Sequence, residues 1–166
     1  CMVLERGDRR VRVTTPSPIH PATMVHPYLT PIGTMFARWD GRESFHAAGL
    51  VVRGGVWGVV GERGVGKSSL VALWTMAGGQ AMCDDVLVVD EKTACVGPRV
   101  FDVRPDTLKV LGLEDAASPV LGREKVRVRM GPVQSELPLH GWLFPEWSDV
   151  ISCSRLAGSD VLQRSA

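Results

Sequence analysis

Apolar residues gather in short runs of strand length along this chain, separated by glycines, prolines and charged residues. Residues 44–53 form one such run and residues 56–60 form a second. Gly54 and Gly55 stand between the two runs and supply a tight turn, so an antiparallel hairpin is predicted. The same patterning predicts further strands or extended segments at residues 9–15, 86–89, 94–96, 98–103, 125–130, 137–144 and 150–153.

The spacing of apolar residues becomes helical after residue 66. It predicts an amphipathic helix that begins near Lys67, ends at Gly78 and Gly79, and buries Leu70, Val71, Leu73, Trp74 and Ala77. A second, short helix is predicted over residues 105–111. Residues 16–33 contain five prolines, a density that disfavours a helix or a central strand, so we expect an irregular wrap there.

Together these elements indicate an α/β fold with a mixed sheet, antiparallel hairpins and few helices. The chain has 166 residues, enough for one domain with its own core. We expect residues 1–43, which hold the N-terminal strand and the proline-rich wrap, to belong to the same domain as residues 44–166. The sequence leaves open a truncation at the C-terminus.

The composition argues against several kinds of partner. Lys and Arg total 19 against 18 for Asp and Glu, so the net charge of +1 gives no case for nucleic acid or a membrane surface. No apolar run approaches the ~20 residues of a membrane-spanning helix, so no membrane partner is expected. The four cysteines form no C-x-x-C pair, which is typical of a reduced, cytoplasmic protein. Cys83 is expected to be a small core residue.

Residues 61–68 match the pattern G-x-x-x-x-G-K-[ST] at each required position. Glycines let such a loop curl until several backbone N–H groups converge on one phosphate, and the following helix adds its positive N-terminal end. Lys67 would add a positive charge on the β- and γ-phosphates, and the Ser68 hydroxyl would bind Mg²⁺. The alternative is a glycine-rich turn without a ligand. The expected ligand is ATP with Mg²⁺, held by Gly61, Arg63, Gly64, Val65, Gly66, Lys67, Ser68 and Ser69.

Two adjacent aspartates, Asp84 and Asp85, follow Lys67 by 17 and 18 positions, a gap that a helix of about three turns and a short loop would fill. Adjacent carboxylates repel one another unless a cation or a proton lies between them. One of them would therefore bind Mg²⁺ and the other would accept a proton from an attacking hydroxyl. We take Ser68 and Asp85 as the expected metal ligands, although the sequence does not decide between the two aspartates. The alternative is a polar turn that caps a strand.

His46, the loop 61–68 and the pair Asp84–Asp85 together resemble the kinase domain of HPr kinase/phosphorylase. The resemblance covers residues 44–104, and the later part is similar to short kinase-like relatives found in lasso-peptide and other peptide-modifying gene clusters. It implies a P-loop fold related to phosphoenolpyruvate carboxykinase and phosphoryl transfer to a serine hydroxyl. It also implies that Asp84, Asp85, His46 and Lys67 are catalytic, with His46 orienting the aspartates. The alternative for His46 is a buried structural histidine.

The chain also departs from that family. Ser69 stands where the family has an acidic residue, and its magnesium-binding glutamate is not evident, although Asp102 could replace it. We expect an ATP-dependent kinase that acts on a serine of a peptide or small protein; the alternative is a nucleotide-binding regulatory module or a slow ATPase. A homo-oligomer is left open.

Five basic residues are candidates to bind phosphate or an acidic peptide, and each has the alternative of a solvated strand residue: Arg99, Arg104, Arg123, Lys125 and Arg127. Trp142 and Trp147 flank a Phe-Pro pair, and we expect them to pack in the core or at a sheet edge.

Overall fold

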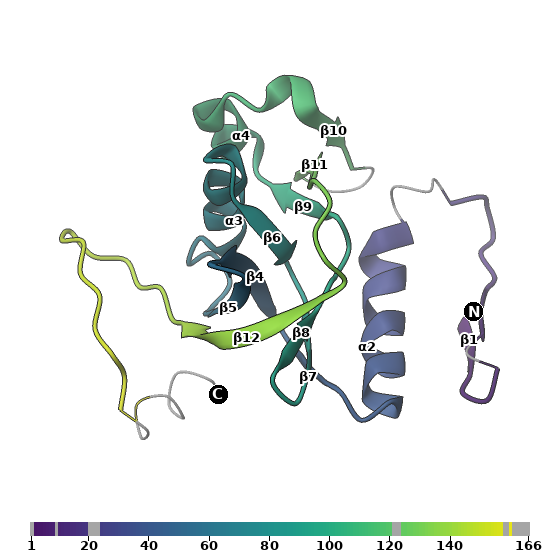
Figure 1. The fold of residues 1–166 in the computed structure, drawn as a ribbon. Coiled ribbons are helices and arrows are strands. Elements are labelled where there is room, and N and C mark those ends of the chain that lie inside the picture. Colours follow the sequence, from purple (N-terminus) through teal and green to yellow (C-terminus); the bar gives the residue numbers. More distant parts are fainter. Residues whose placement is uncertain (1, 9, 20–23, 121–123, 158–159, 161–166) are drawn as a thin grey trace.

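The apolar runs of the sequence pair into a large, mostly antiparallel sheet in a mixed α/β fold (Figure 1). The computed structural model describes residues 2–8, 10–19, 24–120, 124–157 and 160. Within these residues the main sheet has seven strands, in the spatial order β3 (Glu43–Phe45), β7 (Leu87–Asp90), β8 (Thr93–Cys95), β12 (Glu136–Leu143), β5 (Gly55–Val60), β4 (Ala47–Val52) and β6 (Gln80–Cys83).

The predicted hairpin is present as β4 and β5, which pair antiparallel from Ala47 and Val60 to Val52 and Gly55. Its turn is one residue earlier than expected, because Arg53 and Gly54 adopt positive φ angles of 51° and 77° while Gly55 already belongs to β5. The run 44–53 is also not one strand. It is interrupted at His46, where the chain leaves its pairing with β7 and begins its pairing with β5 and β6. Since β3 and β4 lie far apart in the strand order, the sheet must curl to connect them.

Both faces of the β4–β5 hairpin are buried, which explains why these strands are apolar throughout. One face packs against the helix α3 (Lys67–Met76) and the strand β9 (Val100–Val103). The other face packs inside the curl of the sheet, against side chains of β6, β7 and β8. Cys83 is fully buried there, and burial raises the pKa of its thiol, as expected of a core cysteine.

β12 runs parallel to β5, whereas the other neighbouring strands of the main sheet are antiparallel. Glycines face tryptophans across this pair: Gly141 is opposite Trp57, and Trp142 is opposite Gly58. A methyl group added to Gly58 would overlap the ring of Trp142. The pairing therefore depends on glycine at this position.

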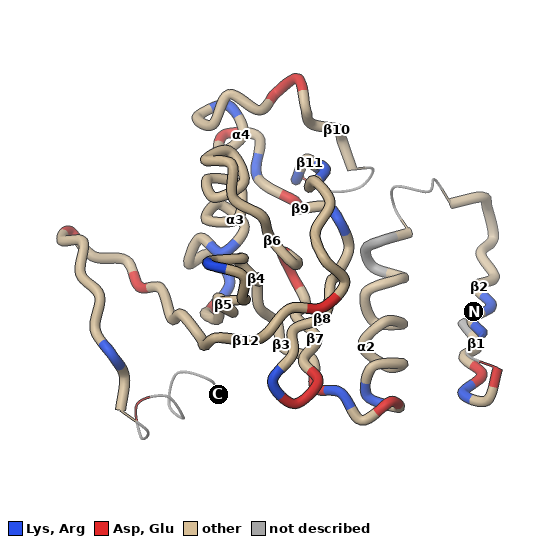
Figure 2. Tube along the Cα trace, viewed as in Figure 1, with Lys and Arg blue, Asp and Glu red and all other residues tan. Residues whose placement is uncertain are grey.

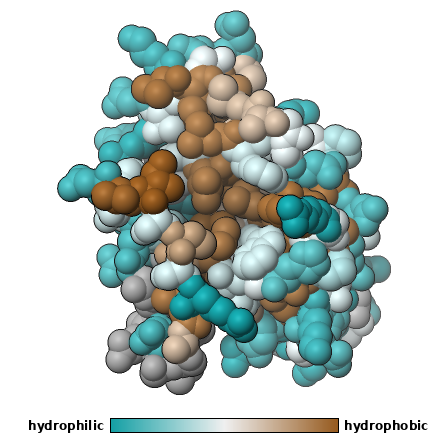
Figure 3. Space-filling view, turned by 60° about the vertical axis from the view of Figure 1, so that its left-hand side comes forward, coloured by the Kyte–Doolittle hydropathy of each residue, from teal (hydrophilic) through white to brown (hydrophobic). Residues whose placement is uncertain are grey.

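α3 has the predicted start and end, but its buried face differs from the predicted one. Val71 and Ala72 are fully buried, whereas Leu73 is 52% exposed and Ala77 is exposed. The helix is covered on two sides, by the main sheet and by β9, and Leu73 points away from both. Leu73, Met76 and Val110 are exposed. The face of the molecule drawn in Figure 3 shows a band of apolar surface.

A three-stranded antiparallel sheet covers the other side of α3, in the order β10 (Ala117–Pro119), β11 (Val126–Arg129) and β9. The short helix predicted over residues 105–111 is confirmed as α4 (Pro105–Leu111), and a 3₁₀ turn, η2 (Glu114–Ala116), follows it. The alternative of a solvated strand residue is wrong for Arg127 of β11, which is buried and paired with Asp102 of β9.

The proline-rich segment is more regular than predicted. After the hairpin β1 (Met2–Glu5) and β2 (Arg10–Val13), a π-helical segment, η1 (Met24–Leu29), leads into the helix α2 (Thr30–Trp39). Pro31 lies in the first turn of α2, where its missing N–H is not needed and its fixed φ suits the helix. The number of prolines therefore led to a wrong prediction here, because a proline in the first turn is compatible with a helix.

The strand predicted over residues 150–153 is absent, and residues 144–157 form an extended arm without regular structure (Figure 1). Trp142 packs as expected, 4.8 Å from Phe45 between ring centroids, but Trp147 is 81% exposed. In the part of the chain that the structure describes, no helix has the length and apolar character needed to cross a membrane.

Candidate active site

The candidate site is built at one edge of the main sheet. β12 is parallel to β5, and β6 also runs in the direction of β5 because each is antiparallel to β4. The carboxyl ends of these three strands therefore meet at the same edge. The glycine-rich loop follows β5, the aspartate pair follows β6, and the segment 144–147 follows β12.

The glycine-rich loop occupies residues 61–66, between the last residue of β5 and the first residue of α3. Gly64 and Gly66 adopt φ angles of 95° and 105°, in the left-handed region that side chains with a Cβ rarely enter. At the start of α3, no side chain caps the helix and no acidic residue lies in its first turn. The first N–H groups of α3 therefore remain available to an anion at the mouth of the loop.

The side chain of Lys67 is buried and folds back over the loop. Its Nζ donates hydrogen bonds to the carbonyl oxygens of Gly61 at 2.5 Å and Glu62 at 3.1 Å. Burial lowers the pKa of Lys67, and the carboxylates of Asp85 and Asp84 oppose that shift. The ammonium group thus lies between the loop and the acidic pair, where it can bind an anion by changing rotamer.

Asp84 lies directly after β6, and that strand was not predicted: a short loop was expected to carry the chain from α3 to the aspartates. The alternation of Gln80 and Met82 with small residues was the available signal. β6 pairs with β4, and this pairing brings Asp84 beside the first turn of α3. Figure 2 shows the acidic segment at the end of β6.

The carboxylate of Asp84 is only 8% exposed. Its Oδ2 accepts a hydrogen bond from the backbone N–H of Asp102 at 3.2 Å, and Ser68 lies near enough to lower its pKa. Among the described residues, its Oδ1 has no hydrogen-bond partner. Burial raises the pKa of Asp84 to about 6, although the hydrogen bond from Asp102 and the neighbouring Ser68 lower it.

Asp85 has a different environment from that of Asp84. Its Oδ1 lies 3.3 Å from Nδ1 of His46, and the two side chains are 43% and 62% exposed. His46 is thus not a buried structural histidine: it stands at the bend between β3 and β4 and reaches a carboxylate near the loop. The acidic pair therefore combines one buried carboxylate that contacts Ser68 with one accessible carboxylate that contacts a histidine.

Asp102 does not have the geometry of a substitute metal ligand. Both of its carboxylate oxygens accept hydrogen bonds from Arg127, at 2.7 Å from Nε and 2.9 Å from Nη2, and both side chains are buried. This bidentate pair fixes β9 against β11. Asp102 acts on the site through its backbone N–H, which holds the carboxylate of Asp84.

The other basic candidates differ in their positions. Arg99 donates from its guanidinium to the carbonyl oxygens of Ala81, Met82 and Gly131, so it ties strands together. The positive charge of Lys125 lowers the pKa of both Lys67 and Asp84. Of these basic candidates, Lys125 therefore has an electrostatic influence on the loop and on the acidic pair. Arg104 is exposed just before α4, and Arg123 lies outside the described residues.

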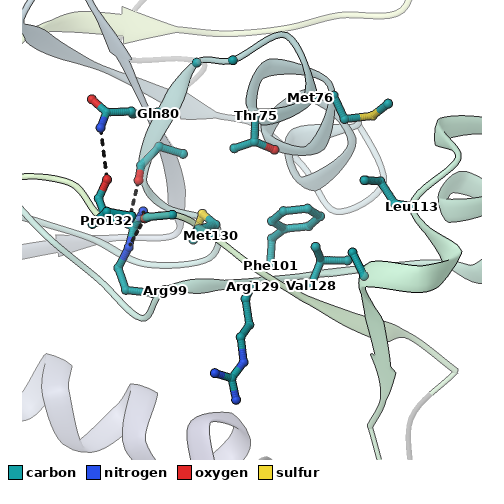
Figure 4. A pocket seen from close by; sticks show the side chains of 15 residues that line it. Thr75, Met76, Gln80, Arg99, Phe101, Leu113, Val128, Arg129, Met130 and Pro132 are labelled. Carbon is teal, nitrogen blue, oxygen red and sulfur yellow. Dashed lines mark hydrogen bonds between the residues drawn. The ribbon is translucent and has the colours of Figure 1, made fainter.

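A cavity of about 330 Å³ lies at the opposite end of α3 from the loop. Phe101, Val128 and Met130 form its apolar floor (Figure 4). Arg99 is on its wall but is held by backbone carbonyls, and the side chain of Arg129 points away from the floor. None of the described residues that line this cavity directs a cation into it, so its lining does not suit a phosphate.

The segment after β12 borders the loop at both ends. A Cβ built on Gly61 would lie 3.9 Å from the carbonyl oxygen of Pro145, and one built on Gly66 would lie 3.9 Å from Cζ2 of Trp147. This contact could not be predicted from the sequence, because it depends on the parallel pairing of β12 with β5. Trp147, expected to be a packing residue, is instead an exposed ring beside the loop.

A solved structure, that of the Hpr(Ser) kinase/phosphatase from Coxiella burnetii, aligns with 61% of this chain at 22% sequence identity and a TM-score of 0.40. The aligned part spans 64% of that protein's chain. Comparison with protein-family models and with curated proteins gives no match.

Proposed function

We propose that this chain binds ATP with Mg²⁺ and transfers the γ-phosphoryl group to a serine hydroxyl of a peptide or small protein. The observation that carries this proposal is the position of the buried Asp84 beside Ser68, in the first turn of the helix that follows the loop. It joins the glycine-rich loop, which suits a polyphosphate, to an acidic pair, which suits a metal ion and a proton transfer. A glycine-rich turn without a ligand would have no need of buried, adjacent charges of both signs.

The residues around Asp84 fit Mg²⁺. A buried carboxylate oxygen without a hydrogen-bond partner lies beside a serine hydroxyl, and both are hard oxygen ligands. The described residues contain no cluster of three or more His, Cys, Asp or Glu side chains suited to a metal. This agrees with Mg²⁺, which commonly takes one or two protein ligands and completes its shell with water and phosphate oxygens. When bound, the ion would neutralise charge on the phosphates.

The geometry favours Asp84, rather than the Asp85 expected from the sequence, as the carboxylate that joins Ser68 in holding the ion. Asp85 is then the general base, because it is accessible to an acceptor and its neighbour His46 can fix its orientation. In the proposed reaction the serine oxygen attacks the γ-phosphorus and its proton passes to Asp85. The bond from the γ-phosphorus to the β,γ-bridging oxygen breaks, and ADP leaves with that oxygen.

Lys67 and the N–H groups of the loop would position the triphosphate. Without an anion, the ammonium group bonds to the carbonyls of Gly61 and Glu62, and on binding it would exchange these partners for β- and γ-phosphate oxygens. Phosphoryl transfer depends mainly on such positioning and on charge stabilisation. The proposal that the acceptor is a serine in a peptide or small protein rests on the sequence resemblance of residues 44–104.

A second candidate function, a nucleotide-binding regulatory module without transferase activity, has one observation in its favour. Asp102, the acidic residue considered as a replacement for the family's magnesium-binding glutamate, is instead paired with Arg127. Such a module would retain the loop, Lys67 and Ser68 but would not need Asp85 beside His46.

The test is transfer of label from γ-labelled ATP to serine peptides, including small precursor peptides encoded next to this gene. The kinase proposal expects label on a peptide serine, loss of labelling in Asp85→Asn with ATP binding retained, and loss of binding in Lys67→Ala. Binding of ATP without labelling of any acceptor supports the regulatory module. Full labelling by Asp85→Asn would refute the assignment of the base.

A further inference from the structure

The glycine-rich loop, residues 61–66, has a different neighbouring segment on each of its two sides at the sheet edge. β5 carries the loop, β12 is its neighbour on one side, and β4 followed by β6 lies on the other. The β6 side ends in Asp84 and Asp85, which the proposed function assigns to Mg²⁺ and the acceptor. The remaining flank is the segment after β12, which touches the loop near Gly61 and Gly66.

That flank carries a large aromatic ring open to solvent. Trp147 is 81% exposed although its Cζ2 lies beside Gly66. Trp142, five residues earlier, is packed against Phe45 and fills the space above Gly58. Tryptophan is on average among the more buried residue types, so a nearly free indole next to a phosphate-binding loop is unusual. An aromatic face at such a position is suited to stack on a planar ligand.

We propose that Trp147 stacks on the base of the bound nucleotide, an inference that rests on the proposed function. Ligands of sheets with parallel strands bind outside the carboxyl ends of those strands, and β5 and β12 end together here. With the phosphates in the loop and the acceptor on the β6 side, the nucleoside leaves the loop over the segment 145–147. The ring of Trp147 lies within that path.

Stacking also defines the specificity of the site. Each base has a π-face, so a tryptophan platform binds ATP and GTP alike and adds affinity without reading the base edge. Inorganic tripolyphosphate has no base, and its affinity therefore reports on the loop alone. A comparison of the two ligands separates the contribution of Trp147 from that of the loop.

The experiment measures by calorimetry the Kd of the wild-type chain and of three variants for ATP and for tripolyphosphate, each with Mg²⁺. We expect Trp147→Ala to bind ATP about tenfold more weakly, since base–aromatic stacking is commonly of that size. Its affinity for tripolyphosphate should stay within about twofold of wild type, which also shows that the variant is folded. Trp147→Phe should retain most of the ATP affinity. Ile151→Ala, a fully exposed position on the same arm, should match wild type.

Two outcomes would overturn the inference alone: ATP affinity of Trp147→Ala within twofold of wild type, or an equal loss for ATP and tripolyphosphate. The equal loss would mean that the arm shapes the loop and does not contact the base. A wild-type chain that binds neither ligand would refute the proposed function and the stacking with it. A fluorescence decrease on ATP binding that is present in the wild type and absent in Trp147→Phe would support the inference independently.

Discussion

Asp84→Asn should make the ligand-free protein more stable at neutral pH. The carboxylate is buried, and burial raises its pKa from 3.8 to about 6. A pKa unit corresponds to about 1.4 kcal/mol, so the ionised carboxylate destabilises the fold by about 3 kcal/mol above pH 7. Asparagine keeps the size of the side chain and an oxygen that can accept from the N–H of Asp102. Because a neutral amide oxygen is a weaker acceptor than a carboxylate, we expect a net gain of about 1 to 3 kcal/mol.

The gain should depend on pH in a defined direction. Between pH 3.8 and about 6 the folded state holds a proton on Asp84 that the unfolded chain has released. The stability of the wild-type protein therefore falls as the pH rises through this window, and the full cost is present above it. The advantage of Asp84→Asn should be complete at pH 7.5, about half as large at pH 5, and close to zero below pH 3.8.

Urea unfolding followed by tryptophan fluorescence at pH 5, 6 and 7.5 measures this difference. Asp85→Asn is the matched control, since it removes a neighbouring carboxylate whose contact with His46 is largely exposed, and it should change stability by less than about 1 kcal/mol. The reasoning is refuted if Asp84→Asn is no more stable than wild type at pH 7.5, or if its gain is the same at pH 5. Loss of Mg²⁺-dependent ATP binding in the stabilised variant would connect the buried charge to function.

Three further predictions concern the loop and the core. Lys67→Ala should weaken calorimetric binding of MgATP by about 100-fold or more, because it removes the buried charge that is proposed to bind the phosphates; unchanged affinity would contradict its role. Gly58→Ala should lower the free energy of unfolding by about 1 to 3 kcal/mol because its methyl group meets Trp142, whereas Gly33→Ala, in open space on α2, should raise it by up to about 1 kcal/mol. Arg127→Met should destabilise the protein by about 3 to 5 kcal/mol in urea unfolding, since it removes the cation that pairs with the buried carboxylate of Asp102; a loss below 1 kcal/mol would argue against the pair.

The local part of the fold could be predicted from the sequence. The β4–β5 hairpin, the helix that begins at Lys67 and the helix over residues 105–111 each follow from apolar spacing and from glycine or proline at their ends. The errors arise where tertiary contacts override local pattern. Leu73 has the spacing of a core residue but points away from the sheets that cover α3. Pro31 was taken as a helix breaker, although in a first turn it is compatible with a helix.

The candidate site divides in the same way. The loop is a contiguous motif, so its residues could be named without any knowledge of the pairing of strands. The environments of Asp84 and Asp85 could not, because they depend on β6 pairing with β4 and on β9 packing behind Asp84. Two residues that look equivalent in the sequence thus receive opposite surroundings. The same long-range pairing places Trp147 by the loop.

Burial of Asp84 should make the binding of MgATP depend on pH, whereas the exposed Asp85 should not contribute to that dependence. A carboxylate with a pKa of about 6 remains partly protonated in slightly acidic solution, and a cation beside it must displace that proton. Affinity for MgATP should therefore fall as the pH drops below about 6, in parallel with the protonation of Asp84. In Asp85→Asn the same fall should persist, because Asp84, the proposed metal ligand, is intact. Identical pH dependence of binding in the wild type and in Asp84→Asn would show that the ion is held elsewhere.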